Sequence, residues 1–505
     1  MKASYTTTIN GVVHSPAITL TFDVEQKYDW IELSVSLSKN GWYSILIWDP
    51  TRCLRAQSLL IKEPKKIFIS SDPNVASFGA VAGEIETGCW TMEILSSRFS
   101  EEHHYAIQYI GGFGKSNQNE IAGVNWAARG ITGGFELNQY CNERIYKSAA
   151  QWYKGDFHTH TTESDGKMTP KSGMNQAKKM ELDFFAATDH NIIPTKWTDD
   201  SIMVLPGVEI TSSKGHFNAL GLTKWIDWRP NCHDGGMESE EGMNRIIREV
   251  KAAGAIVSIN HPMLKPWEWQ YRKTLLATID IVEIWNDPTY KDNPVATEEA
   301  LHLWNNLWND GYRIFGIGGS DSHLLPTESY EEGGPPSVIG DPATYVFCQG
   351  LSARALLDGV KNGRAYVSRG PEYLTNIIVD GESYLPGSDL SMCFDWKDEI
   401  HIWYEVMFIK IPDNGCLWWI RDGIILAKER IHEGKIIQKQ FTLKKEEVSW
   451  IRFEIRSLDG ELLSFINPIY SGEKKHSLLT WGDLLKAQTY SKQQKIACAP
   501  INRPI

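Results

Sequence analysis

The sequence has 505 residues, of which 42% are apolar and 23% charged, and its formal net charge is −12. A chain of this length exceeds what one hydrophobic core can serve, so we expect two or three globular domains. The acidic balance argues against a surface that wraps nucleic acid, because such surfaces use Lys and Arg to neutralise phosphates. A small-molecule partner fits the charge better.

Neither export nor membrane insertion is indicated. The first residues, MKASYTTTINGVVHSPAITLTF, lack the apolar core and cleavage site of a secretory signal, and no later apolar run is long enough to cross a bilayer. Eight cysteines without a CxxC pair fit neither a disulfide scaffold nor a zinc finger. We therefore expect a cytoplasmic protein with no membrane partner, whose oligomeric state the composition leaves open.

Residues 1–148 contain short β-type runs separated by turn residues. The runs include AITLTFDV, WIELSVSL, WYSILIWD and WTMEILSS, and the turns include KNG, DPT and SDPN. This pattern is typical of a β-sandwich. The segment carries no constellation of catalytic residues, and we take it as the first domain.

Residues 149–370 alternate apolar strands with amphipathic stretches of helical length. The strands include FFAATDH, MVLPGVEI, AIVSINHP, IVEIWN and IFGIGGSDSH. This alternation predicts a parallel α/β unit, for which a barrel is the natural closure. Thr169 before Pro170 is expected to cap the first helix, while Ser352 opens and Asn362-Gly363 closes the last.

Residues 371–505 return to β-type runs broken by Gly and Asp-Gly turns. The runs include YLTNIIVDG, EIHIWYEVMFIKI, GCLWWIRDG and WIRFEIRSLDG, which predict a second, smaller β-sandwich-like domain. The last stretch, AQTYSKQQKIACAPINRPI, has an irregular pattern. It fits a tail packed along the body or a frayed end.

Six motifs of the middle segment place His, Asp and Glu at or just after the ends of expected strands: DFHTHTTESDG, ATDHN, PGVEI, GHFNALG, INHP and GGSDSH. In α/β barrels the carboxyl-terminal rim holds the active site. The candidate metal ligands are His158, His160, Asp165, His190, Glu209, His216, His261, Asp321 and His323. Imidazole and carboxylate without thiolate suit zinc, manganese or iron.

The spacing within two motifs favours shared ions. Alternate residues of a strand point the same way, so His158 and His160 can converge on one ion, as can Asp321 and His323. Taken singly, Glu209 also fits a salt-bridged carboxylate, and a lone histidine fits a satisfied core position. Six motifs in strand-end register favour ligation over these alternatives.

The succession HxH, TDH, GxE, NHP and SDxH resembles the signature of the polymerase and histidinol phosphatase (PHP) superfamily, over about residues 150–370. The resemblance implies a distorted (β/α)7 barrel, two or three divalent metal ions and hydrolysis of phosphoesters. More narrowly, GEIETGCWTMEIL, VEIWN, GIGGSDSH, KNGRAYVSRGP and INPIY resemble the CehA/McbA-like metallohydrolases. That second resemblance extends over most of the chain.

The resemblance also implies a role for each ligand. One metal would be held by His158, His160, Glu209 and Asp321, a second by Glu209, His216 and His261, and a third by Asp165, His190 and His323. Several relatives have a histidine where Asp165 stands. Glu209, as the bridge, would form the catalytic centre with Asp321 and His216.

Other residues are candidates for support and for binding substrate. Arg369 in SRGP is the remaining catalytic candidate, because its fork geometry suits phosphate. Lys214 is a second anion candidate, for which an exposed, solvated charge is at least as good an explanation. The residues expected to orient ligands are Thr188, Asp189, Asn260, Asn286 and Ser320. Trp225, Trp228, Trp267 and Trp269 are candidates to stack an aromatic or sugar group, although core and loop packing is the favoured explanation for the tryptophans of this region.

These observations predict a metal-dependent hydrolase. Water between two divalent cations loses a proton near neutral pH, and the resulting metal-bridging hydroxide can attack a small phosphate mono- or diester. The sequence has no GxSxG elbow, which argues against a covalent serine mechanism. Two alternatives stay open: a carboxyl-ester or carbamate hydrolase with the same metal centre, and a non-catalytic binding or scaffold protein with a relic barrel.

Overall fold

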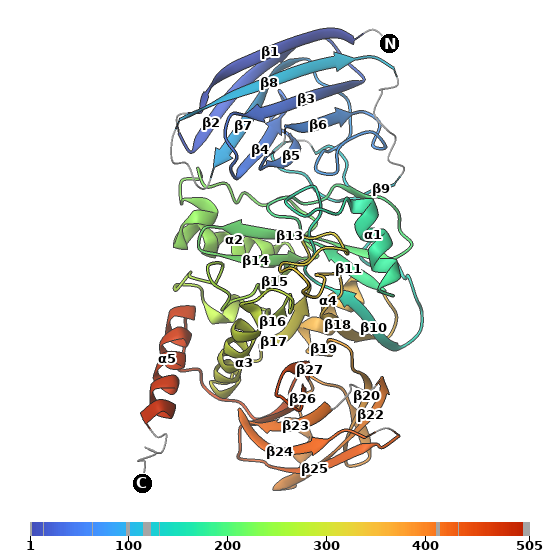
Figure 1. The fold of residues 1–505 in the computed structure, drawn as a ribbon, viewed down its shortest axis with the longest axis vertical. Helices are drawn as coiled ribbons and strands as arrows, with labels where there is room; N and C mark the ends of the chain where they lie inside the picture. The colour runs from blue at the N-terminus through green and yellow to red at the C-terminus, as the bar shows by residue number, and fades with distance from the viewer. Residues whose placement is uncertain are drawn as a thin grey trace.

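The computed structural model describes residues 3–13, 15–62, 64–96, 102–114, 123–130, 132–410, 415–432 and 434–497. Three bodies follow one another along the long axis (Figure 1). Strands β1–β8 form the first, the site-bearing mixed α/β body lies in the middle, and strands β20–β27 form the third. Helix α5 (Trp481–Ala497) lies beside the last two.

The first body is a sandwich of two four-stranded antiparallel sheets. One sheet has the order β1 (Ala3–Val13), β8 (His103–Gly112), β3 (Trp30–Leu37), β6 (Lys65–Ser70). The other has the order β2 (Ala17–Val24), β7 (Gly88–Ser96), β4 (Tyr43–Trp48), β5 (Leu54–Leu60). Alternate residues such as Ile31, Leu33 and Ile45 are fully buried between the sheets, as the period of two in these runs predicts.

Seven neighbouring strands form the sheet of the middle body. Their order is β10 (Gln151–Asp156), β11 (Phe184–Ala187), β13 (Met203–Ser212), β14 (Gly215–Leu220), β15 (Ile256–Ile259), β16 (Ile281–Asn286) and β17 (Phe315–Gly319). The first and last strands of this row meet just beyond their carboxyl ends. Thr159 and Ser322 form a parallel bridge there, and Asp321 N donates to His158 O over 2.8 Å. The residues after β10 and β17 are therefore side by side.

The mixed α/β class is confirmed, but the regular (β/α)7 alternation is not what the structure shows. Helices α1 (Pro170–Lys179), α2 (Glu240–Ala252) and α3 (Asn293–Asn309) occupy three of the six connections between these strands. A segment with the short strand β12 (Lys196–Trp197), a hairpin turn and the 3-10 helix η2 (Leu276–Thr278) occupy the others. The helix caps predicted at Thr169 and Ser352 are confirmed: each side chain accepts a backbone hydrogen bond.

The hairpin is the one of these three connections that also reverses the strand direction. Strands β13 and β14 are antiparallel and joined through Ser213 and Lys214, so β14 also runs against β15. Gly215 begins the return strand at φ +126°, where an L side chain would be strained and a Cβ would lie 2.9 Å from the Cα of Trp269. A Ser-Lys-Gly turn between two apolar runs is a hairpin signal, but our sequence interpretation took only the first run as a strand and placed GHFNALG at its end, within a parallel unit.

The same long sheet continues into the third body. Beyond β10 it runs through β18 (Ala343–Cys348), β19 (Ala365–Ser368), β27 (Leu462–Ile466), β26 (Ser449–Ser457), β23 (Gly415–Arg421) and β24 (Ile424–Arg430). A second sheet of β21 (Glu382–Tyr384), β20 (Glu372–Val379), β22 (Glu399–Lys410) and β25 (Ile437–Lys444) packs against it around a separate apolar core. The domain boundaries at 148 and 370 stay predictions.

The remaining elements are short. They are β9 (Val124–Asn125), which pairs with β12, β28 (Ile469–Ser471), α4 (Ala353–Lys361), and the 3-10 helices η1 (Gly236–Glu238) and η3 (Ser391–Phe394). Most of the stretch expected to be irregular, residues 487–497, is helical in α5, and residues 498–505 lie outside the described ranges. In the part of the chain that the structure describes, we find no helix with the length and apolarity needed to cross a membrane.

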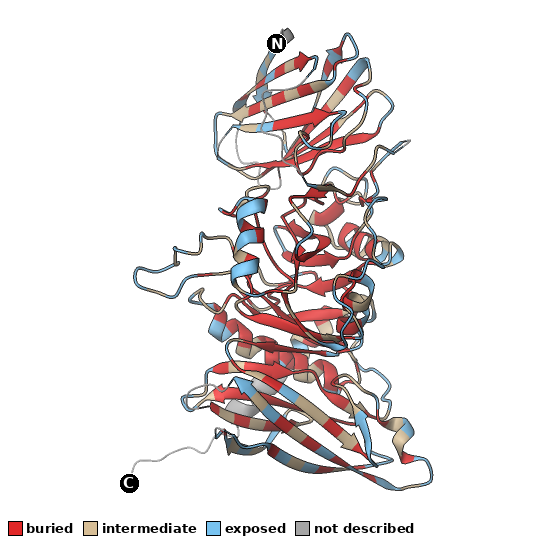
Figure 2. Ribbon diagram, turned by 90° about the vertical axis from the view of Figure 1, so that its right-hand side faces the viewer, coloured by how far each residue is buried: buried red, intermediate tan, exposed pale blue. Residues whose placement is uncertain are grey.

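Burial is densest in the strands of the middle body (Figure 2). Every residue of β11, β13, β14, β15, β16 and β17 is buried. Strands covered on both faces read as continuous apolar runs, so a polar side chain within such a run is costly unless it has a partner. The polar side chains at the ends of these strands form the candidate site.

Candidate metal centre

The structure brings all nine sequence-predicted ligands to one rim of the middle sheet. Six follow the carboxyl end of a parallel strand: His158 and His160 after β10, His190 after β11, His261 after β15, and Asp321 and His323 after β17. Asp165 lies in the loop that leads to α1, and Glu209 lies inside β13. His216 is different, because it is the second residue of β14. Since β14 runs antiparallel to its neighbours, its amino end meets their carboxyl ends.

Four overlapping groups could each hold an ion. Within each group one ligand atom per residue lies within 4.8 Å of the others. The groups are His158, His160 and Asp321; His158, Glu209 and His261; His190, Glu209 and His216; and His160, Asp165, His190 and His323. The first and last agree closely with the first and third metal positions that the resemblance implies.

Glu209 occupies the middle of the cluster and is fully buried. Its Oε1 lies 3.2 Å from His158 Nε2, 3.2 Å from His216 Nδ1 and 3.4 Å from His261 Nε2. Its Oε2 lies 2.6 Å from His190 Nδ1. Each carboxylate oxygen therefore faces a different set of imidazoles, as a bridging ligand requires.

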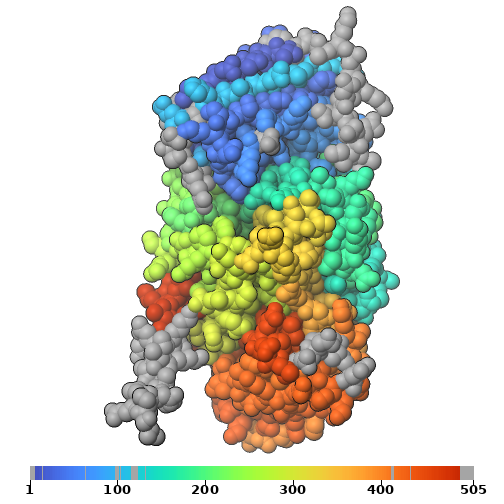
Figure 3. Space-filling view, in the orientation of Figure 1, coloured from blue at the N-terminus to red at the C-terminus, as the bar shows by residue number. Residues whose placement is uncertain are grey.

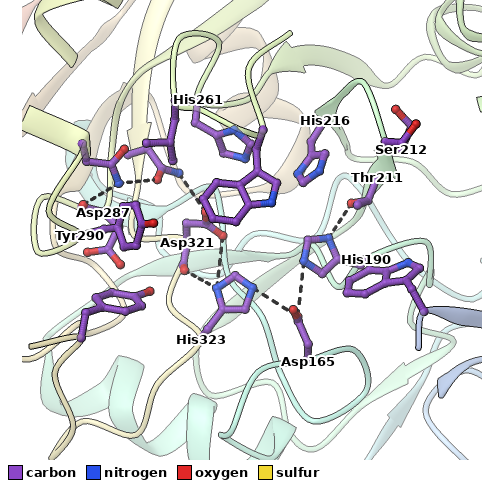
Figure 4. A pocket seen from close by; sticks show the side chains of 17 residues that line it. Asp165, His190, Thr211, Ser212, His216, His261, Asp287, Tyr290, Asp321 and His323 are labelled. Atoms are coloured by element: carbon purple, nitrogen blue, oxygen red, sulfur yellow. Dashed lines mark hydrogen bonds and ion pairs between the residues drawn. The ribbon is translucent and has the colours of Figure 1, made fainter. Parts of the chain in front are cut away.

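Asp321 and Asp165 link the other imidazoles. Asp321 Oδ1 lies 2.9 Å from His160 Nε2 and 3.2 Å from His158 Nε2. Asp165 Oδ1 lies 3.4 Å from His190 Nε2 and 3.2 Å from His323 Nε2. Figure 4 shows Asp165 between His190 and His323, with a dashed line to each.

At two of the ligands, Glu209 and His160, the surroundings favour the protonation state that binds metal. Burial alone would raise the pKa of the Glu209 carboxyl, but His158, His190 and His216 outweigh it and hold that pKa well below its ordinary value. Burial, with His323 and His190 close by, lowers the pKa of His160 to about 4. The carboxylate is thus ionised and this imidazole neutral at pH 7, which are the forms that bind metal.

Buried atoms without hydrogen bonds provide a test of whether these residues fit a metal. Such atoms include His158 Nε2, His160 Nε2, His216 Nδ1, Asp165 Oδ1 and Asp321 Oδ1. Buried polar atoms are otherwise satisfied in more than about nine cases in ten. Here they face one another across the cluster, and their nitrogen and oxygen donors suit divalent ions. The residues of the cluster therefore fit divalent metal ions.

Two ligands have backbone conformations that L residues seldom adopt. His261 has φ +28° and Asp321 has φ +48°. Such strain costs about 1–3 kcal/mol per residue and persists where the surrounding structure holds it in place. At that cost the adjoining strands position His261 near Glu209 and Asp321 near His158 and His160.

Glu283 is a supporting residue that we did not single out from the sequence. It is buried in β16, and its Oε1 lies 3.0 Å from His158 Nδ1 while its Oε2 accepts from His261 N over 2.8 Å. Accepting from Nδ1–H leaves His158 Nε2 free for a metal. The available signal was a carboxylate inside the apolar run IVEIWN, since a buried charge needs a partner.

Replacing Glu283 with glutamine should weaken metal binding at His158 about tenfold, in line with the effect of other outer partners of ligands. Glu283 Oε2 now accepts from His261 N and Asn286 Nδ2, and Oε1 faces His158 Nδ1. Glutamine would place an NH2 donor at one of these two acceptor positions. Competition with a chromophoric chelator would measure the affinity. Glu332→Gln, at an exposed position, is the matched control, and equal affinities in both variants would contradict this role.

The other expected supporting residues differ in what they contact. Asn260 Nδ2 donates to Glu209 Oε1 over 2.8 Å, as a positioning residue should, and Asn286 Nδ2 approaches Asp321 Oδ2 at 3.3 Å. Asp189 instead accepts from Thr161 and Ser164, which fixes the loop before Asp165. The remaining two act on the same backbone, because the Thr188 hydroxyl bonds to Thr159 and the Ser320 hydroxyl donates to His158 O.

A cavity of about 330 Å³ opens over the cluster. Its described lining consists of Trp42, Asp165, His190, Thr211, Ser212, Ser213, His216, His261, Leu264, Trp267, Asn286, Asp287, Tyr290, Asn293, Asp321, His323 and Tyr330. This volume suits a small ligand. Trp42 comes from the first body and was not among our candidates.

Several sequence candidates lie elsewhere. Arg369 is not among the described residues that line the cavity; its Nε donates to Asp341 Oδ1 over 3.0 Å, so its guanidinium is paired with a carboxylate of this chain. Lys214 Nζ donates to Glu238 O. Of the four tryptophans proposed to stack on substrate only Trp267 lines the cavity, and the other three, Trp225, Trp228 and Trp269, are buried in the core.

No protein-family model and no curated protein matches this chain. Among solved structures it is similar to a two-domain protein from Bacteroides vulgatus with a predicted PHP-like metal-dependent phosphoesterase, at 17% identity over 65% of this chain and 99% of the other, with a TM-score of 0.32. It is also similar to a proposed metal-dependent phosphoesterase from Bifidobacterium adolescentis, at 18% identity over 37% and 92%, with a TM-score of 0.25.

A third similar structure is an amidohydrolase from Chromobacterium violaceum with bound sulfate and no metal, at 14% identity over 35% of this chain and 89% of the other, with a TM-score of 0.23. At identities and TM-scores this low, the similarities assign neither a family nor a substrate. The functional conclusion depends on the cluster itself.

Proposed function

We propose that this protein is a metal-dependent hydrolase that acts on a small phosphate mono- or diester. The observation that carries the proposal is the convergence of nine carboxylate and imidazole side chains, with buried Glu209 in their middle, on the floor of a cavity. The order of the motifs and their resemblance to the PHP superfamily point to the same reaction class.

The ligands would divide among two or three divalent ions. His158, His160, Glu209 and Asp321 would hold one, Glu209, His216 and His261 a second, and Asp165, His190 and His323 a third. Zinc, manganese and iron all suit this donor set. When bound, such ions lower the pKa of water and neutralise charge that grows on the substrate's oxygens.

The chain's own groups would prepare the site for this chemistry. Asn260 Nδ2 donates to Glu209 Oε1 and holds the carboxylate in one orientation. Glu283 fixes the tautomer of His158. Among the described residues that line the cavity there is no Lys or Arg, so the metals would supply the positive charge that a phosphoryl group needs.

The second candidate is a carboxyl-ester or carbamate hydrolase that uses the same metal centre. The lining favours it in one respect, because a cavity with four Trp and Tyr side chains and, in its described part, no cationic side chain also suits an uncharged substrate. A panel of aryl esters and aryl carbamates, run beside the phosphoesters, separates the two. Faster turnover of the uncharged panel would replace the phosphoesterase proposal.

Metal removal and reconstitution test the proposal directly. The protein stripped with a chelator should be inactive, and manganese or zinc should restore hydrolysis of p-nitrophenyl phosphate or bis(p-nitrophenyl) phosphate. Elemental analysis should find two or three ions per chain. Absence of turnover of any phosphoester with any metal would refute the proposal, and absence of stoichiometric metal would favour a binding or scaffold role.

A further inference from the structure

We infer that the first β-body builds part of the substrate site through Trp42, and that Trp42 together with Trp267, Tyr290 and Tyr330 selects substrates whose non-reacting group is planar and uncharged. The inference rests on the proposed function only for the reacting end of the substrate. It assigns a specificity role to a body that carries none of the metal ligands.

Trp42 approaches the cluster from outside the middle sheet. It follows the turn between β3 and β4 and is half-buried, and its ring centroid lies 5.0 Å from that of His190 in an edge-to-face arrangement of 67°. It lines the same cavity as His190, His216 and His261. A group that reached the cluster through this cavity would therefore contact the indole.

The first body is fixed to the middle body close to the ligands. Lys65 Nζ donates to Thr162 O over 2.9 Å, two residues after His160, and Gln57 Nε2 donates to Ile193 O over 2.6 Å, three residues after His190. Thr195 Oγ1 donates to Ala80 O over 2.6 Å. Figure 3 shows the two bodies in direct contact. These bonds fix the first body, which carries Trp42, against the segments that follow His160 and His190.

Three more rings form a wall across the cavity. The Tyr290 ring lies 6.0 Å from that of Trp267 and 5.3 Å from that of Tyr330, both edge to face. In Figure 4, Tyr290 and Asp287 lie on the opposite side of the cavity from His190, the neighbour of Trp42. A flat group between the two sides would have aromatic contacts on both.

The aromatic wall offers no charge for an anionic group. The described lining contains three carboxyl groups, those of Asp165, Asp287 and Asp321, and no Lys or Arg. The Asp287 carboxylate accepts from Thr289 and from Ser337 over 2.8 Å, and burial raises its pKa. A second anion placed there would meet carboxyl and phenol groups without a counter-charge.

Binding of inert phosphonates to the metal-loaded protein tests the inference without depending on turnover. Calorimetry should show that phenylphosphonate binds more tightly than methylphosphonate, and that 4-phosphonobenzoate, with its added carboxylate, binds more weakly than phenylphosphonate. Trp42→Leu should reduce the phenyl-over-methyl preference roughly threefold to tenfold, the loss expected for one aromatic contact. Trp42→Phe should retain most of it, and methylphosphonate affinity and metal content should be unchanged.

Trp403→Leu is the matched control, because Trp403 is 46% exposed on β22 of the third body, and it should bind like the parent protein. An unchanged phenyl preference in Trp42→Leu would overturn the role of Trp42, and tighter binding of 4-phosphonobenzoate would overturn the selection for an uncharged group. Intact phenyl preference without turnover of any phosphoester would contradict the proposed function alone. Failure of both phosphonates to bind would contradict both.

Discussion

Glu209→Gln is expected to remove more than one metal equivalent per chain and to reduce hydrolysis on the order of 10³-fold. The glutamine side chain fills the same space, so the core around β13 should keep its packing. It lacks the negative charge that five histidines now approach, with Oε1 near His158, His216 and His261 and Oε2 near His190 and His160. A bound metal contributes several kcal/mol of transition-state stabilisation, and about 4 kcal/mol corresponds to 10³-fold.

Elemental analysis and steady-state kinetics on the same preparation measure this result. Circular dichroism should show a folded variant, since only one atom of the side chain changes identity. Glu331→Gln, on the exposed loop after Tyr330, serves as control and should retain full metal content. Loss of a single equivalent in Glu209→Gln would show that the carboxylate does not bridge two ions.

The ligand set could be predicted because strand ends and chemistry coincide in the sequence. A parallel strand delivers the residue after it to one rim of the sheet, so HTH, TDH and SDSH are placed by the strand pattern alone. The apolar runs before them are long enough to identify. For these motifs, the local sequence carries the information that decides the position.

For His216, the same reasoning predicted the correct rim of the sheet but the wrong strand direction. We expected it after a strand of a parallel unit, whereas it is the second residue of the antiparallel strand β14. The amino end of an antiparallel strand and the carboxyl ends of its neighbours share one edge, so the outcome is the same. The strand direction depends on the Ser213-Lys214 turn, which the apolar pattern does not report.

Trp42 and Arg369 show the limit of local patterns. Nothing in KNGWYS marks an indole that lies against His190, because the contact exists only once the first body has docked on the middle body. Arg369 has the chemistry for phosphate but is paired with Asp341. Which partner a charged or aromatic group finds is decided by packing between segments far apart in the chain.

Asp165→Ala should remove one metal equivalent, leave those around Glu209 in place and reduce hydrolysis on the order of 10²-fold, which corresponds to about 2.7 kcal/mol. Asp165 Oδ1 lies near His190 and His323 but belongs to none of the groups that contain Glu209. Its removal also leaves His323 without the carboxylate that, with Asp321, raises its pKa to about 10 against the effect of burial.

Asp165→His discriminates between a ligand role and a purely electrostatic one. The PHP resemblance places histidine at this position in several relatives, so the imidazole should keep the third ion and most of the activity. Metal content and kcat of the two variants, measured together, give the comparison. If Asp165→Ala loses as many ions as Glu209→Gln, the separate third position is wrong; if Asp165→His loses the ion too, Asp165 holds it through charge, since an imidazole supplies the donor atom but not the charge.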